Sequence, residues 1–157
     1  MVTKIISGAQ TGADRAGLDV ALVLGLGVGG WIPRGRRTDE GPLSPEDFLR
    51  YKLCEHSSTA YLPRTKQNVL ESHGTVLFGR MTTPGCALTI RLCRLHGKPL
   101  VKNPNYAELR AFVDRFAVRV LNVAGNRERT NPGIYALAYH ILLAALGPDN
   151  SGGEGAS

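Results

Sequence analysis

The chain has 157 residues, of which 43% are hydrophobic, a size and apolar content that suit one domain with an ordinary core over residues 1–147. Its cysteines, Cys54, Cys86 and Cys93, fit neither a disulfide framework nor a CxxC metal site. The formal net charge of +6 favours anionic partners, but no run of five like charges occurs and only 6% of residues are aromatic, which argues against a nucleic-acid track.

The sequence also argues against a membrane-bound protein. No apolar segment approaches the roughly 18 to 20 residues that a membrane span needs. Nothing resembles a signal peptide, because the first apolar run, Ile5-Ile6, gives out at Ser7. We therefore expect a soluble, cytoplasmic protein that binds neither nucleic acid nor membrane.

Strand-like and helix-like segments alternate along the chain. Leu18, Ala21 and Leu22 recur at helical spacing, and Ser44 before Pro45 is typical of a helix start. The expected strands are 2–6, 28–32, 59–62, 75–78, 99–102 and 118–123, and the expected helices are 14–26, 45–54, 65–72, 86–95, 106–116 and 132–146.

This alternation predicts a Rossmann-like α/β fold, a three-layer sandwich with a mainly parallel sheet of about five strands. Ligands of such sheets bind outside the carboxyl ends of the strands, where the strand order reverses. The loops that follow the strands are therefore the candidates for function. Residues 148–157, a Gly/Ser-rich tail, are expected to be disordered.

The first such loop is Ser7-Gly8-Ala9-Gln10-Thr11-Gly12. Its glycines allow a ligand to approach the backbone, and N–H groups at the following helix start attract anions. The loop is neither G-x-G-x-x-G nor a Walker A sequence, and a tight capped turn explains it equally well.

Three further loops carry candidate ligand groups. Gly29–Gly41 presents Arg34, Arg36 and Arg37, whose guanidinium forks match oxyanions, or else is a solvated basic turn. The segment 61–68 offers Thr65 and Asn68 at a helix start, with Thr65 as an alternative N-cap. The segment 79–91 has a Thr83-Pro84-Gly85 turn before Cys86, which is either a reactive thiol or, as we favour, a packing residue.

A catalytic or metal-binding constellation is not evident. His56, His73, His96 and His140 form no i, i+4 pair and no HExxH motif. There is no G-x-S-x-G elbow and no close pair of acids beside a nucleophile. We expect a binding protein without catalysis or a protein-built metal site.

Six segments resemble, in order, those of the molybdenum-cofactor carrier family: SGAQTGADRAGLD, GGWIPRGRRTDEG, RTKQNV, HGTVLF, TPGCALTI and LNVAGNRERTNPGIY. These carriers are Rossmann-like relatives of the lysine-decarboxylase-like, or lonely-guy, phosphoribohydrolases. The resemblance spans roughly residues 4–146. It implies binding of molybdenum cofactor (molybdopterin), an anionic pterin phosphate with a dithiolene-held oxomolybdenum centre, which the protein protects and carries for transfer to molybdoenzymes.

The resemblance also implies a set of cofactor-binding residues and partners. The set is Gly8, Gln10, Thr11, Gly12, Arg15, Arg34, Gly35, Arg36, Thr65, Asn68, Thr83, Gly85 and Thr89. No protein ligand to molybdenum is implied. Implied partners are molybdoenzymes or the cofactor-synthesis machinery, and further copies of the chain in a homo-oligomer, often a tetramer.

Two positions depart from the relatives, and one segment has two interpretations. Leu92 stands where the lonely-guy enzymes have their catalytic Glu, and His73 replaces an Asp. In residues 122–135 we expect Asn131 to cap a helix that starts at Pro132, with an Arg127–Glu128 ion pair, or a role in closing the pocket or joining subunits. The alternatives to a carrier are a nucleoside-monophosphate phosphoribohydrolase and a nucleotide sensor that binds ADP-ribose or a dinucleotide.

Overall fold

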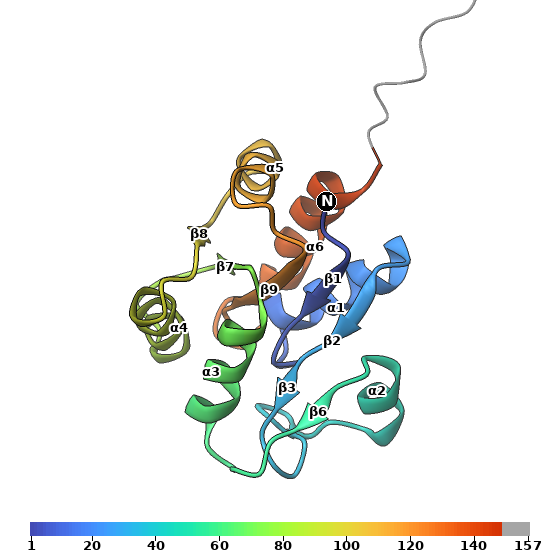
Figure 1. The fold of residues 1–157 in the computed structure, drawn as a ribbon. Helices are drawn as coiled ribbons and strands as arrows, with labels where there is room; N and C mark the ends of the chain where they lie inside the picture. The colour runs from blue at the N-terminus through green and yellow to red at the C-terminus, as the bar shows by residue number, and fades with distance from the viewer. Residues whose placement is uncertain (149–157) are drawn as a thin grey trace, which may run out of the picture.

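The centre of the molecule is a five-stranded parallel sheet, seen in a computed structural model that describes residues 1–148 (Figure 1). The strand order is β2-β1-β9-β7-β8, and every pairing is parallel. The strands are β1 (Lys4–Ile6), β2 (Gly27–Gly29), β7 (Gly74–Phe78), β8 (Leu100–Lys102) and β9 (Val120–Gly125). The expected Rossmann-like α/β fold is confirmed.

Helices cover both faces of this sheet. Helices α1 (Ala13–Leu24), α5 (Tyr106–Arg115) and α6 (Ile134–Leu146) pack together on one face, and α3 (Tyr61–Glu71) packs with α4 (Pro84–Leu95) on the other. The strands are apolar because they are covered on both sides: all five residues of β7 are buried. The main core joins the sheet to α1, α5 and α6, and a smaller cluster of Val69, Leu92 and Cys93 lies between α3 and α4.

A small lobe with its own two-stranded sheets follows β2. The expected strand 28–32 is divided at Gly30, where φ is +130° and a Cβ would lie 2.0 Å from the Ser7 carbonyl oxygen. The chain turns there, and β3 (Trp31–Ile32) leaves the main sheet to pair with β6 (Cys54–Glu55). The lobe also contains the β4–β5 hairpin (Arg37–Thr38 and Gly41–Pro42) and helix α2 (Pro45–Arg50), which Ser44 caps as expected.

Several expected elements differ from the observed ones. The expected helix 45–54 ends at Arg50, and Cys54 belongs to β6. Residues 59–62 form no strand; α3 begins at Tyr61, because Pro63 in the first helical turn needs no N–H partner. Helix α6 begins at Ile134 after Gly133, which has φ +93°. The carboxylate of Glu128 accepts hydrogen bonds from the N–H groups of Gly133 and Tyr135 there, in place of the expected cap by Asn131 and ion pair with Arg127.

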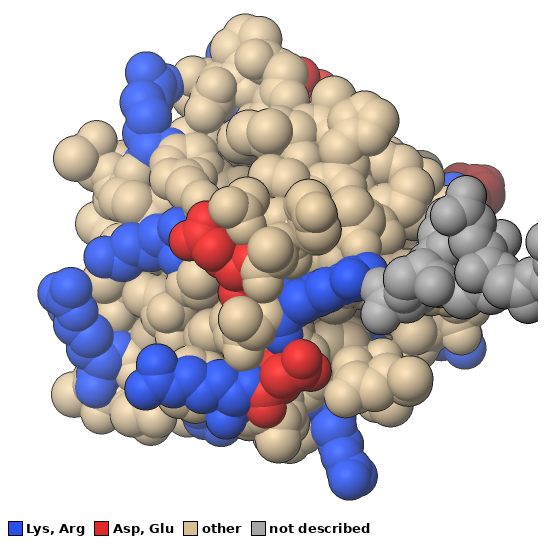
Figure 2. All heavy atoms as spheres, turned by 90° about the horizontal axis from the view of Figure 1, so that it is seen from above, with Lys and Arg blue, Asp and Glu red and all other residues tan. Residues whose placement is uncertain are grey.

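The structure also bears on the expectations about membrane spans, the C-terminal tail and the charged surface. In the described part of the chain no helix is both long and apolar enough to cross a membrane. Of the tail expected at 148–157, all but Pro148 lies outside the described residues. On the end of the molecule drawn in Figure 2, basic side chains are separated by uncharged surface and by acidic side chains, so this face presents no continuous basic stripe.

The contact of α1 with the sheet depends on Gly17. A Cβ at this helical position would lie 2.7 Å from the Val123 Cβ in β9. We expect Gly17→Ala to destabilise the fold by about 1–3 kcal/mol in urea denaturation, because such overpacking outweighs the better helix propensity of Ala. Gly85→Ala is the matched control, since nothing lies within 4 Å of its Cβ position; equal stability of both variants would contradict the argument.

Candidate functional site

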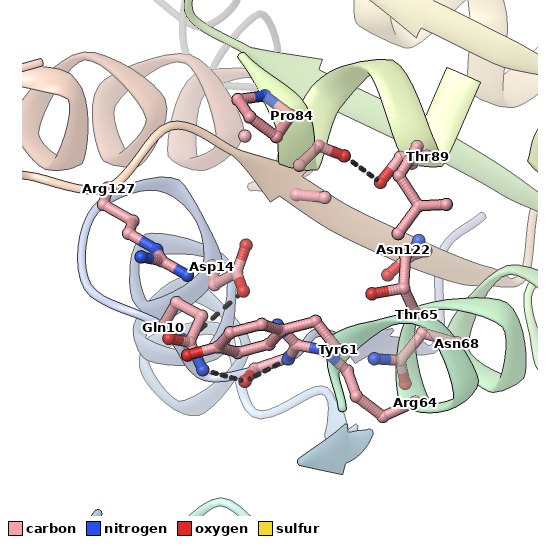
Figure 3. Close-up of a pocket in the computed structure, with 15 residues that line it drawn as sticks. Gln10, Asp14, Tyr61, Arg64, Thr65, Asn68, Pro84, Thr89, Asn122 and Arg127 are labelled. Carbon is pink, nitrogen blue, oxygen red and sulfur yellow. Dashed lines mark hydrogen bonds between the residues drawn. The ribbon is translucent and has the colours of Figure 1, made fainter. Parts of the chain in front are cut away.

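A cavity of about 240 Å³ lies where the carboxyl ends of the central strands meet. The strand order places β9 between β1 and β7, so the loop after the last strand meets the loop after the first. The walls come from the first loop and α1, from α3, from the start of α4 and from the end of β9, where Asn122, Ala124 and Gly125 line the space. Figure 3 shows side chains from all four walls around this space. It is the reversal point that parallel sheets use for ligands.

The first loop is held by its own hydrogen bonds. Ser7 Oγ accepts from the Ala9 N–H and donates to the Asp14 carbonyl, and Ala9 takes φ +58°. The N–H groups of Gln10, Thr11 and Ala13 donate to Asp14, Asp39 and Asn126 respectively. Most of the backbone N–H groups that we expected to bind an anion are therefore hydrogen-bonded within the protein. The positive charge of the cavity must come from side chains and from other helices.

That charge is supplied first by Arg64 on α3. Its side chain is only 6% exposed, and Nη1 donates to the Gly8 carbonyl oxygen at 2.7 Å. Gly8 is required here, because a Cβ would lie 1.8 Å from that nitrogen. Arg64 Nε is buried without a hydrogen-bond partner. Because buried polar groups are normally satisfied, this unpartnered N–H leaves the guanidinium incompletely satisfied within the protein.

Asn68 lies one helical turn after Arg64 and anchors the small lobe. Its side chain accepts from the Trp31 N–H at 2.8 Å and donates to the Trp31 carbonyl at 3.2 Å. The Trp31 indole donates to Glu71 at 2.7 Å and lies edge-on to His56. Asn68 thus lines the cavity and fixes β3 beside it.

Asp14, in the first turn of α1, is the buried acid of the cavity. Its burial raises its pKa to about 6, although Arg64, the Gln10 N–H, Arg127 and Arg15 all act to lower it. Burial likewise lowers the pKa of Arg64, but an arginine keeps its proton at neutral pH. The two side chains flank Gly8, yet they form no ion pair within 4.0 Å.

Three guanidiniums surround the ring of Tyr61 at the edge of the cavity. Their carbon atoms lie 4.6 Å (Arg37), 5.1 Å (Arg64) and 5.2 Å (Arg127) from the ring centroid, within cation–π range. They come from the β4–β5 hairpin, α3 and the loop before α6. In Figure 3 the ring extends from α3 toward Gln10. This part of the cavity wall therefore combines an aromatic ring with a concentration of positive charge.

Gln10 and Asp39 join the hairpin to the first loop. Gln10 Nε2 donates to the Arg37 carbonyl at 3.0 Å, and its Oε1 accepts from the Asp39 N–H at 3.1 Å. The Asp39 carboxylate accepts from the N–H and the hydroxyl of Thr11. Burial would raise the pKa of Asp39, but the hydrogen bonds from Thr11 outweigh it and hold the pKa below its ordinary value. These hydrogen bonds between the first loop and the β4–β5 hairpin keep Arg37 beside Tyr61.

The start of α4 forms the opposite wall. Thr83 caps the helix by accepting from the Cys86 N–H, and Thr89 Oγ1 donates to the Gly85 carbonyl. Pro84, Gly85, Leu88 and Thr89 line the cavity, so the positive end of the helix dipole faces it. Burial raises the pKa of Cys86, which agrees with a packing residue and not with a reactive thiolate.

Six of the thirteen expected binding residues line the cavity: Gly8, Gln10, Thr65, Asn68, Gly85 and Thr89. The other seven support its walls or lie in the small lobe. Thr11 donates to Asp39 of the hairpin, Gly12 is the N-cap residue of α1, and Thr83 is the N-cap residue of α4. Arg15 donates to the Ala9 carbonyl. Arg34, Gly35 and Arg36 follow β3, and Arg36 Nε donates to the Leu43 carbonyl.

The cavity is also lined by polar and aromatic residues that the set implied by the resemblance does not include: Asp14, Tyr61, Arg64, Asn122 and Arg127. A helix start at Tyr61 would have placed Tyr61, Arg64 and Asn68 on one face. Asn122 and Arg127 carried no such signal, because their position depends on the strand order. In residues 1–148, no three His, Cys, Asp or Glu side chains gather closely enough to hold a metal ion.

The fold and the site together define a Rossmann-like binding domain with a cationic pocket at the strand ends. The chain belongs to the circularly permutated YpsA SLOG family, whose model matches residues 5–146. The solved structure of a Syntrophus aciditrophicus SB protein named "Putative molybdenum carrier protein" is similar over 92% of this chain and 95% of that chain, with a TM-score of 0.84 and 34% identity. The family membership inferred from the motifs is confirmed, and these similarities support a binding role.

A match among curated proteins is much shorter. Progonadoliberin-2 of Aquarana catesbeiana is 42% identical over 43 residues, which are 27% of this chain and 46% of that protein. The chain therefore spans less than half the length of that relative. So short a match carries no functional argument.

The buried acid has a measurable effect on stability. Because the folded-state pKa of Asp14 is about 6 and its ordinary value is 3.8, ionising it in the fold costs about 3 kcal/mol, at about 1.4 kcal/mol for each factor of ten. This cost is absent below about pH 4 and complete above about pH 6.

We therefore expect Asp14→Asn, which can still accept from the Gln10 N–H, to be more stable than the parent by about 3 kcal/mol above about pH 7. The difference should vanish toward about pH 4. Urea denaturation across this pH range measures the difference in stability. Glu40→Gln, which removes an exposed carboxylate, is the control. A difference independent of pH would show that Asp14 is not the strained acid.

Proposed function

We propose that the protein binds molybdenum cofactor in the cavity at the strand ends and carries it to molybdoenzymes. The observation that carries this proposal is the buried guanidinium of Arg64, whose Nε lacks a partner in the cavity wall. A buried guanidinium forms its strongest hydrogen bonds with an anionic acceptor, so the site favours an anion. The similar protein named as a molybdenum carrier supports the choice of anion.

The chemistry of the walls suits such a cargo. Its phosphate and its oxomolybdenum head are oxyanions, for which Arg64, Arg127 and the start of α4 supply positive charge. Its pterin is a flat ring, for which the planar guanidiniums around Tyr61 are suitable stacking contacts. The roles of the protein are to hold the cofactor by charge and stacking and to shield it from water, without a protein ligand to molybdenum.

The size of the cavity indicates how much of the cargo it encloses. Pockets for drug-sized ligands usually measure about 300–1,000 Å³, and this one measures about 240 Å³. One end of the cofactor would be enclosed and the remainder would lie at the entrance, beside Tyr61 and Arg127. An accessible remainder is what transfer to a recipient enzyme requires. The homo-oligomer expected from the family resemblance stays a prediction.

Arg127 offers the cleanest test of the site. We expect Arg127→Ala to weaken anaerobic equilibrium binding of molybdenum cofactor about ten- to a hundredfold, the worth of a charge-assisted hydrogen bond. Arg36→Ala should have a smaller effect, because Arg36 is engaged with Leu43 outside the cavity. Arg91→Ala, an exposed position on α4 away from the cavity, is the control.

AMP serves as the competitor in the same experiment. Micromolar or tighter cofactor binding that resists AMP and weakens in Arg127→Ala supports the carrier. Equal or better binding of AMP would contradict it and favour a nucleotide-binding protein.

The phosphoribohydrolase alternative is tested by product analysis. Leu92, at the position of the catalytic Glu in the enzymes that the sequence resembles, is buried in the cluster with Val69 and Cys93 and does not line the cavity. We expect no adenine release from AMP beyond the protein-free rate, measured by chromatography with Asp14→Asn as a comparison. Adenine release that Asp14→Asn abolishes would establish an enzyme with a different acid.

A further inference from the structure

The strongest unexplained feature of the cavity is the arrangement of its two buried charges. Arg64 and Asp14 are 6% and 7% exposed, they have opposite charges, and they flank the same glycine. Buried opposite charges normally pair directly. Here they form no ion pair within 4.0 Å, and Arg64 Nε has no hydrogen-bond partner.

Gly8 defines the space between these groups. A Cβ on Gly8 would lie 1.8 Å from Arg64 Nη1 and 3.1 Å from Asp14 Oδ2, so both side chains reach the same side of the first loop. Arg64 Nη1 already donates to the Gly8 carbonyl, and Asp14 Oδ2 already accepts from the Gln10 N–H at 3.2 Å. Nη1 makes the one hydrogen bond that holds the guanidinium to the first loop, and Arg64 lines the cavity together with Asp14, so the guanidinium retains donors for a ligand.

We propose that a tetrahedral oxyanion binds to the Arg64 guanidinium beside the Asp14 carboxyl, and that Asp14 takes up one proton from solvent as the oxyanion binds. The proposal rests on the proposed function, since it assigns the oxyanion end of the cargo to this position. A proton on Asp14 removes the repulsion between two anions and supplies an O–H that can donate to the ligand. The step breaks no covalent bond of the cargo; a single proton moves from solvent to the carboxylate.

The groups around Asp14 give the direction of the effect. Those that face it are Arg15 on its own helix, Arg64 on α3, Arg127 before α6 and Cys86 on α4, with Tyr61 beside Arg64. The arginines favour the carboxylate, but burial outweighs them and places the pKa of Asp14 at about 6. A bound oxyanion neutralises part of the arginine charge and repels the carboxylate, so it raises this pKa further.

Linkage then fixes the pH dependence of binding. Below about pH 6 Asp14 is already protonated in the free protein, and affinity is independent of pH. Above about pH 6 each binding event takes up a proton, and affinity falls about tenfold for each pH unit until the pKa of the complex is reached. The device favours capture at lower pH and release at higher pH.

The experiment uses sulfate as the probe, because it stays a dianion throughout the range. Isothermal titration calorimetry of the full chain between about pH 5 and pH 8, in two buffers of different ionisation enthalpy, gives both affinity and proton uptake. We expect uptake of about one proton above pH 6 for the parent and for Glu40→Gln, and none for Asp14→Asn. Arg64→Lys should bind sulfate more weakly, since it loses the planar guanidinium.

Sulfate binding without proton uptake by the parent, or the same pH dependence in Asp14→Asn, would overturn the proposal. The two-buffer measurement on the parent needs no variant, so it decides the matter even where a substitution unfolds the chain. Absence of any sulfate binding at about pH 5, where Asp14 is protonated, would also overturn it.

Competition between sulfate and molybdenum cofactor separates this inference from the proposed function. Displacement of the cofactor by sulfate, with the same proton uptake, places the oxyanion of the cargo at Arg64. Proton-coupled sulfate binding in a protein that does not bind the cofactor would support the oxyanion site and reject the carrier. Cofactor binding with no proton uptake and no competition would support the carrier and reject the site.

Discussion

The hydrogen bond from Arg64 to the Gly8 carbonyl oxygen is the interaction on which the site depends. It joins α3 to the first loop across 56 positions of sequence, and it exists only because residue 8 has no side chain to exclude the guanidinium. With α3 held in this position, Asn68 fixes Trp31, and Trp31 begins the strand that leads to the basic loop. This buried cation thus acts together with the Gln10 and Asp39 hydrogen bonds to position the small lobe relative to the main sheet.

Burying the Arg64 guanidinium costs free energy of desolvation, and the protein does not offset this cost with a direct ion pair. Direct contact between Arg64 and Asp14 would satisfy both charges, whereas the structure holds them apart and leaves one donor open. Sites that bind charged ligands commonly retain strain of this kind, because groups arranged for a ligand are not arranged for stability. The fold tolerates the cost because the main core, around α1, α6 and the central strands, is continuous and well buried.

The sequence predicted the fold well because its signals are local. Alternating strands and helices, the Ser44 cap and the glycine turns can all be interpreted without knowledge of distant contacts. The first loop and the start of α4 were therefore identified as cavity walls. The site was predicted less completely. Asn122 and Arg127 line the cavity because β9 lies at the centre of the sheet, and the order of the strands cannot be predicted from any single segment.

The position of the arginine-rich loop depends on one turn in the chain. Arg34 and Arg36 look suited to an anion in the sequence, yet Gly30 redirects the chain, and the loop is held by backbone contacts with Ser58 and Leu43 outside the cavity. Only Arg37, further along, reaches the Tyr61 ring. A positive φ at one glycine thus decided which cations face the site, and the charge pattern alone did not contain that information.

The bond between Asn68 and Trp31 has an optical consequence. Trp31 is the single tryptophan of the chain, its main chain is held by a side chain of the cavity wall, and its indole lies against Glu71 and His56. A shift of Asn68 when the cavity fills is therefore transmitted to the environment of this indole. The protein contains its own fluorophore, adjacent to the site, whose emission can follow occupancy without a label.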